Sequence, residues 1–88
     1  MASDAASGLS IRLGRLLAEE VGRPFIFIAL PKQAVTVAQL RRLIAEQYPR
    51  LQSWMDHVLV VAEGRVLDSS EAIPVGRQVV LLPPQAGG

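Results

Sequence analysis

The C-terminal residues are the part of this 88-residue chain whose types and spacing suggest a chemical role. Directly after an apolar run come small or conformationally unusual residues: Pro83, Pro84, Gln85, Ala86, Gly87 and Gly88. The two glycines cost conformational entropy and add nothing to a core, but a backbone without Cβ atoms can enter a narrow channel. Residues 85–88 extend roughly 13 Å at about 3.3 Å per residue, far enough to leave a small domain. We therefore expect a tail that presents the carboxylate of Gly88 to another protein, with an inert floppy end as the alternative.

Other residue types that carry chemistry are scarce. The sequence contains no cysteine, so it offers no thiol nucleophile, redox centre, disulfide or zinc thiolate. His57 is the only histidine, which excludes a two-histidine metal motif and leaves any zinc site to carboxylates around one imidazole. We therefore expect no bound metal, and we interpret His57 as a loop residue that follows a helix.

Composition and charge set further bounds. Half of the residues are apolar, which predicts one small domain with a packed core. Nine basic and eight acidic side chains are scattered along the chain and leave a net charge of +1, which argues against a nucleic-acid partner. The longest apolar run, residues 24–31, is far shorter than the ~20 residues that span a bilayer, and the N-terminus does not resemble a signal peptide. We expect a cytoplasmic protein with no membrane partner.

Apolar runs and period-2 alternation predict strands at residues 9–13, 25–30, 58–62, 65–67 and 78–82. Glu63 and Gly64 separate the third and fourth strands as a tight hairpin turn. The two prolines at 83–84 end the last strand because neither residue can donate to a ladder.

Two segments show helical spacing. The secure one covers residues 37–48, where Thr36 and Gln39 match a capping box and a proline follows at position 49. Its apolar residues share one face, and Arg41 and Arg42 are interpreted as solvated. A second, barely two turns long, follows Gly14 and contains Leu16 and Leu17. The element order predicts an α+β fold, a mixed four- to five-stranded sheet with one main helix packed across it and a short extra helix.

The residues around the tail carry a family resemblance. The stretch 79–88 is an apolar strand, Pro-Pro, two further residues and Gly-Gly. With the preceding order of strands and helices, it resembles the β-grasp (ubiquitin-like) sulfur-carrier family, and most closely the small subunit of molybdopterin synthase. The resemblance implies a disordered N-terminus at 1–8, a β-grasp domain at 9–84 and a flexible Gly-Gly tail at 85–88.

The resemblance also implies a function in molybdenum cofactor (molybdopterin) biosynthesis. An E1-like adenylating enzyme would use ATP to activate Gly88, and a persulfide protein would supply sulfur to form a thiocarboxylate. The tail would then enter the large subunit of molybdopterin synthase, so that the chain binds no cofactor and is not catalytic alone. The implied site residues are Gly88 and Gly87 at the reacting end, Pro83, Pro84, Gln85 and Ala86 in the tail, and Leu13, Val66 and Leu82 at the partner contact.

Alternatives from other classes stay open. A thiamine-pathway sulfur carrier also ends in Gly-Gly but is usually shorter and lacks the Pro-Pro step. A ubiquitin-like protein modifier would join its terminal glycine to target lysines, and a plain interaction module would leave the tail inert. The sequence also leaves open what covers the second face of the sheet, because one helix covers only one face. The other face is either covered by loops and the short helix or exposed as a protein interface.

Overall fold

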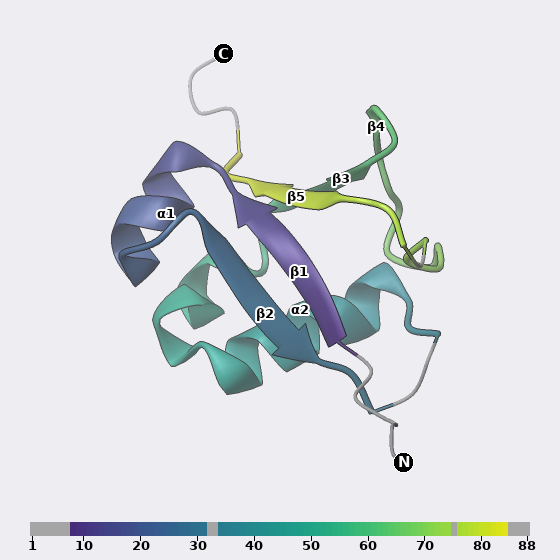
Figure 1. Ribbon diagram of the computed structural model, residues 1–88, viewed down its shortest axis with the longest axis horizontal. Coiled ribbons are helices and arrows are strands. Elements are labelled where there is room, and N and C mark those ends of the chain that lie inside the picture. Colours follow the sequence, from purple (N-terminus) through teal and green to yellow (C-terminus); the bar gives the residue numbers. More distant parts are fainter. Residues whose placement is uncertain (1–7, 32–33, 75, 85–88) are drawn as a thin grey trace.

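A computed structural model describes residues 8–31, 34–74 and 76–84. Within these ranges five strands form one mixed sheet in the order β2-β1-β5-β3-β4 (Figure 1). The strands are β1 (Gly8–Leu13), β2 (Phe25–Ala29), β3 (Leu59–Ala62), β4 (Arg65–Val66) and β5 (Val79–Leu82). β1 and β5 are parallel neighbours and every other pair is antiparallel. The predicted β-grasp fold, with its first and last strands side by side, is therefore confirmed.

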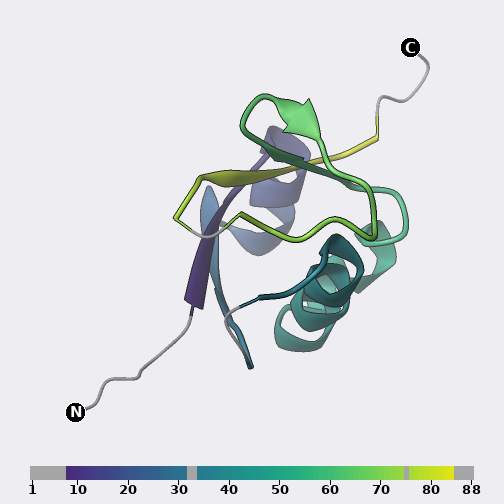
Figure 2. The same cartoon turned by 90° about the vertical axis from the view of Figure 1, so that its right-hand side faces the viewer.

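Helices lie against one face of this sheet. The main helix α2 (Val37–Gln47) crosses that face, α1 (Arg15–Val21) follows β1, and the 3-10 helix η1 (Pro49–Trp54) follows α2 (Figures 1 and 2). In the part of the chain that the structure describes, none of these helices is long and apolar enough to span a bilayer.

The start of α2 confirms the predicted capping box. The Thr36 hydroxyl accepts a hydrogen bond from the backbone N–H of Gln39 (3.2 Å), and the Gln39 amide oxygen accepts one from the N–H of Thr36 (2.8 Å). The helix ends at Gln47, and its C-cap is Tyr48, where the following Pro49 disfavours helical backbone. The following η1 was not expected; it begins at Pro49, because proline is well suited to a first helical turn.

The core lies between α2 and the face of the sheet that α2 covers, here called the inner face. Strand residues alternate between this face and the opposite, outer face, as in β1, where only every second side chain is buried. The two leucines of α1 have different environments: Leu17 is buried in this core, whereas Leu16 is exposed. The buried apolar residues are Leu9, Ile11, Leu13, Leu17, Ile26, Ile28, Val35, Val37, Leu40, Ile44, Leu51, Met55, Val58, Val60, Ala62, Leu67, Ile73, Val79 and Leu81.

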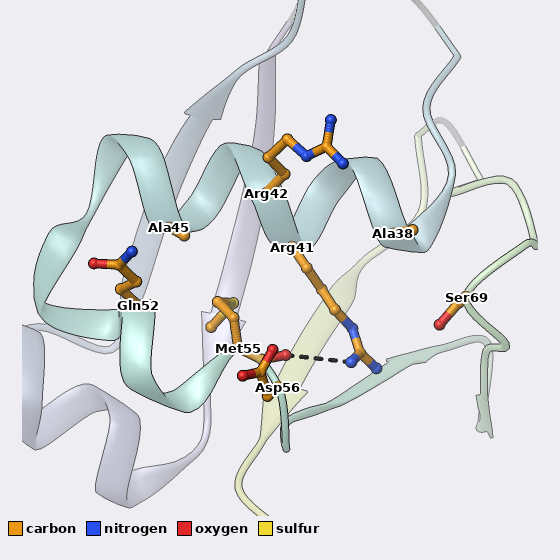
Figure 3. Close-up of a pocket in the computed structure, with 8 residues that line it drawn as sticks. All are labelled: Ala38, Arg41, Arg42, Ala45, Gln52, Met55, Asp56 and Ser69. Atoms are coloured by element: carbon orange, nitrogen blue, oxygen red, sulfur yellow. Dashed lines mark hydrogen bonds between the residues drawn. The ribbon is translucent and has the colours of Figure 1, made fainter.

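Two neighbouring arginines on α2 also have different environments. Arg42 is exposed as predicted, but the prediction that Arg41 is solvated is wrong. The Arg41 guanidinium is half-buried and donates to the carbonyl oxygens of Met55 (3.2 Å) and Val58 (3.1 Å), as Figure 3 shows for the first of these bonds. The Arg41 side chain therefore links α2 to the segment that follows η1, because it donates to carbonyl oxygens of that segment.

The hairpin between β3 and β4 forms at the predicted turn. Glu63 (φ 53°) and Gly64 (φ 80°) both have left-handed backbone conformations, as a two-residue turn of type I′ requires. Arg65 in β4 then forms a two-pronged ion pair with Glu71, with one N–O distance of 3.2 Å. The Glu71 carboxylate also accepts from the backbone N–H of Asp68 (2.9 Å). This network ties the short strand β4 to the loop that follows it.

Candidate functional site

The root of the predicted tail is the first part of the candidate site. Pro83 and Pro84 follow β5 directly and lie at the end of the sheet where β1 also finishes, because the two strands are parallel (Figure 1). The N–H of Gly14 donates to the carbonyl oxygen of Leu81 (2.8 Å), which extends the ladder one residue beyond β1. A Cβ atom on Gly14 would lie only 3.0 Å from Cδ of Pro83. The proline ring thus sits against the β1–α1 junction, in space that a glycine leaves open.

The rest of the predicted tail consists of residues 85–88. Gln85, Ala86, Gly87 and Gly88 lie outside the described residues, so their expected roles stay predictions. What the structure supplies is the direction in which the chain leaves the domain, which is past the ends of β1 and β5.

The outer face of the sheet is the second part of the candidate site. The pairing register places one row of residues across the strands: Phe25, Arg12, Val80, Val61 and Val66. Phe27 on β2 is 57% exposed, Val66 52% and Phe25 43%. The loop after β4 bonds to α2, where the N–H of Val37 donates to the Glu71 carbonyl oxygen, and so belongs to the inner side. Of the two alternatives left by the sequence, the described residues therefore favour an exposed apolar face.

Two of the three predicted contact residues lie on this outer face. Leu82 is half-buried and pairs with Leu59, and Val66 pairs with Val61. Leu13 does not lie there: it is only 5% exposed and points into the core. The prediction that Leu13 contacts a partner is therefore wrong. Successive side chains of a strand point to opposite faces, so Leu13 lies on the same face as the buried Leu9 and Ile11.

Sequence reasoning missed the aromatic part of the outer face. The sequence places Phe25 and Phe27 in a strand but does not indicate which face of the sheet their side chains occupy. The signal was available in the alternation with Ile26 and Ile28, but that run is apolar at every position, so only the tertiary fold shows which set is covered. Phe27 also lies over Gly8, where a Cβ would approach the end of its ring within 1.8 Å.

Charged groups lie both on the outer face and beside it. Arg12 stands in register between Phe25 and Val80, so a cation interrupts the apolar row near the middle of the sheet. Next to Val66, the Arg65 hydrogen bonds hold the pKa of Glu71 below its ordinary value, helped by the backbone N–H of Asp68. The same hydrogen bonds with Glu71 raise the pKa of Arg65. The ion pair thus persists at neutral pH and fixes the end of the sheet that carries Val66.

One surface hollow is formed by described residues that lie away from the tail root. This hollow, shown in Figure 3, has a volume of about 380 Å³ and is lined by residues of α2, η1 and the loop after β4, including Arg41, Asp56 and Ser69. The Arg41 guanidinium there already binds two carbonyl oxygens. Within residues 8–31, 34–74 and 76–84, no three His, Asp or Glu side chains are grouped so that they could hold a metal ion. The geometry therefore points to the tail root and the outer face as the surfaces available for function.

Comparisons with known proteins agree with this architecture. The sequence profile of the ThiS family matches residues 17–88. SAMP1 from Haloferax volcanii has a similar structure, with a TM-score of 0.75 and 24% identity over 93% of this chain and 100% of that chain. The Haloferax volcanii HVO 2177 protein gives a TM-score of 0.74 and 27% identity over 100% and 94%. The small archaeal modifier protein 1 from Methanosarcina acetivorans has a TM-score of 0.65 and 15% identity, over 96% of this chain and 99% of that chain. No curated protein matches the sequence.

Proposed function

This chain belongs to the ThiS family of β-grasp sulfur carriers, and we propose that it carries sulfur as a thiocarboxylate on Gly88 for molybdopterin synthesis. The observation that supports the proposal is the tail root. Two prolines follow β5 at the end of the sheet where β1 also finishes, and the first of them, Pro83, packs against Gly14. A terminal carboxylate on such a tail can enter the active site of another protein.

The chemistry needs no catalytic side chain from this chain. A carboxylate is a poor electrophile, so an E1-like activating enzyme attaches AMP to the Gly88 carboxylate and releases pyrophosphate from ATP. The outer sulfur of a persulfide protein then displaces AMP, which gives an acyl disulfide. A thiol of the partner proteins attacks the inner sulfur of this disulfide, so that a new disulfide forms between the partner thiols and a thiocarboxylate is left on Gly88. The large subunit of molybdopterin synthase receives the tail, and the sulfur passes to a pterin precursor. ATP is consumed by the activating enzyme, and this chain holds no cofactor of its own.

The outer face fits the second requirement of a carrier, which is to be recognised by successive partners. Its apolar residues continue along β5 through the half-buried Val80 and Leu82, directly before the two prolines at the tail root. A partner that docks on this face therefore lies beside the point where the tail departs. We assign Leu82 and Val66 to that contact and add Phe25 and Phe27 on β2.

The first experiment tests the tail. The protein is incubated with ATP, the activating enzyme and a sulfur donor, and the C-terminal peptide is examined by mass spectrometry for exchange of one oxygen for sulfur. Deletion of Gly88 should abolish the exchange, and Gly87→Val should impair it through steric exclusion from a narrow channel. Both variants should keep the wild-type melting temperature, because a glycine has no side chain that could pack in the core. Ser53→Ala, an exposed change on η1, is the control that should react normally. An unmodified wild-type terminus, under conditions where a known carrier reacts, would refute the proposal.

The second experiment tests the outer face. Val66→Asp should weaken binding to the large subunit while leaving stability nearly unchanged, because the Val66 side chain is already half exposed. Leu16→Asp is a matched control, since Leu16 is equally exposed (51% against 52%) but lies on α1. Equal binding by both variants would remove the outer face from the contact.

A protein-modifier function is the second candidate, and the similarity to two structures of small archaeal modifier proteins favours it. The same activated Gly88 would then form an isopeptide bond with a lysine of a target protein. Offering the activated protein separately to the molybdopterin synthase large subunit, to a thiazole synthase of the thiamine pathway and to lysine-bearing targets distinguishes the three outcomes. Sulfur transfer to the pterin precursor alone supports the first proposal, whereas isopeptide products without sulfur transfer support the modifier.

A further inference from the structure

The free edge of β2 has an unusual set of hydrogen-bond partners. β2 stands at one end of the strand order and pairs only with β1. Alternate residues bond to β1, as Pro24 does through its carbonyl oxygen to the N–H of Leu13. The backbone groups of Phe27 and Ala29 face the other way, toward the open edge. Unpaired N–H and C=O groups on such an edge form a template for a further strand.

Two side chains from the end of α2 occupy this template. The Gln47 side-chain oxygen accepts from the N–H of Ala29 (3.0 Å), and its NH₂ group donates to the Ala29 carbonyl oxygen (2.9 Å). The Tyr48 hydroxyl accepts from the N–H of Phe27 (3.4 Å) and donates to the Phe27 carbonyl oxygen (3.3 Å). Each side chain thus makes the donor-and-acceptor pair that one residue of an added antiparallel strand would make.

The sequence around Pro49 holds both side chains in place. Tyr48 is the C-cap of α2 with φ −131° and ψ 79°, outside the helical conformation that the following proline disfavours, and its N–H still donates to the Ile44 carbonyl oxygen (2.7 Å). Gln47 is the last residue of the helix. The two consecutive side chains therefore reach two residues of β2 that are themselves two positions apart.

We propose that Gln47 and Tyr48 form an edge latch that prevents a second copy of this chain from adding its β2 to β2. A second copy is the partner that the edge fits, because two β2 strands can pair antiparallel about a twofold axis. Such a pair would also continue the exposed row of Phe25 and Phe27 across both outer faces. The opposite end of the sheet is protected differently, since β4 is only two residues long.

The test removes the hydrogen bonds of the latch and keeps the aromatic ring of Tyr48. In the double variant Gln47→Ala/Tyr48→Phe, the aromatic ring remains but both donor-and-acceptor pairs are lost. Sedimentation over a range of concentrations should show the average mass rising from the 9.5 kDa monomer toward twice that value, while wild type stays monomeric. The control Glu46→Ala/Arg50→Ala changes exposed residues on either side of the latch and should stay monomeric. Adding Ala29→Pro to the double variant should restore the monomer, because proline removes an edge donor that β1 does not use.

Hydrogen exchange gives the second readout. At low concentration, the Phe27 and Ala29 amides of the double variant should exchange about two- to tenfold faster than in wild type. They should become protected again as the mass rises. A folded double variant that stays monomeric at every concentration, or an association that Ala29→Pro leaves intact, overturns the proposal. If the double variant unfolds, the same measurements are made on the single variants Gln47→Ala and Tyr48→Phe. Single variants that fold, stay monomeric and show unchanged exchange of the Phe27 and Ala29 amides refute the latch.

Discussion

Arg41 offers the sharpest test of how this small domain is held together. Its neighbour Arg42 has the same residue type on the same helix, so Arg41→Ala and Arg42→Ala change helix propensity and net charge equally. Only Arg41 donates to the carbonyl oxygens of Met55 and Val58. Any difference between the two variants therefore measures the link between α2 and the chain that follows η1.

The expected magnitude follows from these contacts. Hydrogen bonds from a charged donor contribute about 1.5–3 kcal/mol each, and the lower value applies here because the site is half-buried. Two such bonds give about 3 kcal/mol. The Arg41 Nε atom is buried without a partner, and removing that cost returns about 1 kcal/mol. Arg41→Ala should therefore lose about 2 kcal/mol of unfolding free energy, and Arg42→Ala should stay within about 0.5 kcal/mol of wild type.

Urea unfolding at equilibrium measures this difference, with the slope m checked for two-state behaviour. In a thermal scan, the loss for Arg41→Ala corresponds to a fall of roughly 8–16 °C in melting temperature for a domain of this size. Arg41→Lys should recover part of the loss, since an ammonium cannot reach both oxygens in the planar geometry of a guanidinium. Equal stability of the two alanine variants would show that Arg41 is only a surface residue, and the reasoning would be wrong.

Three further predictions concern the core, the loop after β4 and the packing of the Phe27 ring over Gly8 in β1. Leu40→Ala and Ile44→Ala should each cost about 2–5 kcal/mol in urea unfolding because both side chains are fully buried, and a loss below about 1 kcal/mol would contradict the packing of α2. The pKa of Glu71 is lowered in the folded state, so its contribution is complete above its ordinary value near 4.5 and is lost as pH falls through the folded pKa. The stability difference between wild type and Glu71→Gln, followed by unfolding at several pH values, should therefore shrink on acidification, whereas a constant difference would exclude the ion pair. Gly8→Ala should displace the Phe27 ring, visible as changed aromatic NMR shifts, while costing less than about 1 kcal/mol because the ring is exposed and can move aside.

Much of the fold could be predicted because its signals are local. The capping box of Thr36 and Gln39, the hairpin at Glu63 and Gly64, and the stops at the prolines each depend on the chemistry of a few consecutive residues. Period-2 alternation in β1 also assigned its buried face correctly. Local rules missed η1, because the proline that ends one helix can also begin the next.

The sequence by itself determined the order of the five strands and of the two helices with apolar periodicity. It also determined the Pro-Pro-x-x-Gly-Gly pattern that carries the family resemblance. Tertiary structure alone decided which residues of the continuous apolar run in β2 are covered, so it buried Ile26 and Ile28 and exposed Phe25 and Phe27. It also decided that Arg41 binds distant carbonyl oxygens and that two side chains at the end of α2 bond to the edge of β2. The physical reason is the same in each case. Propensity and periodicity act over a few residues, whereas burial and hydrogen-bond partners depend on segments that meet only when the sheet and α2 pack together.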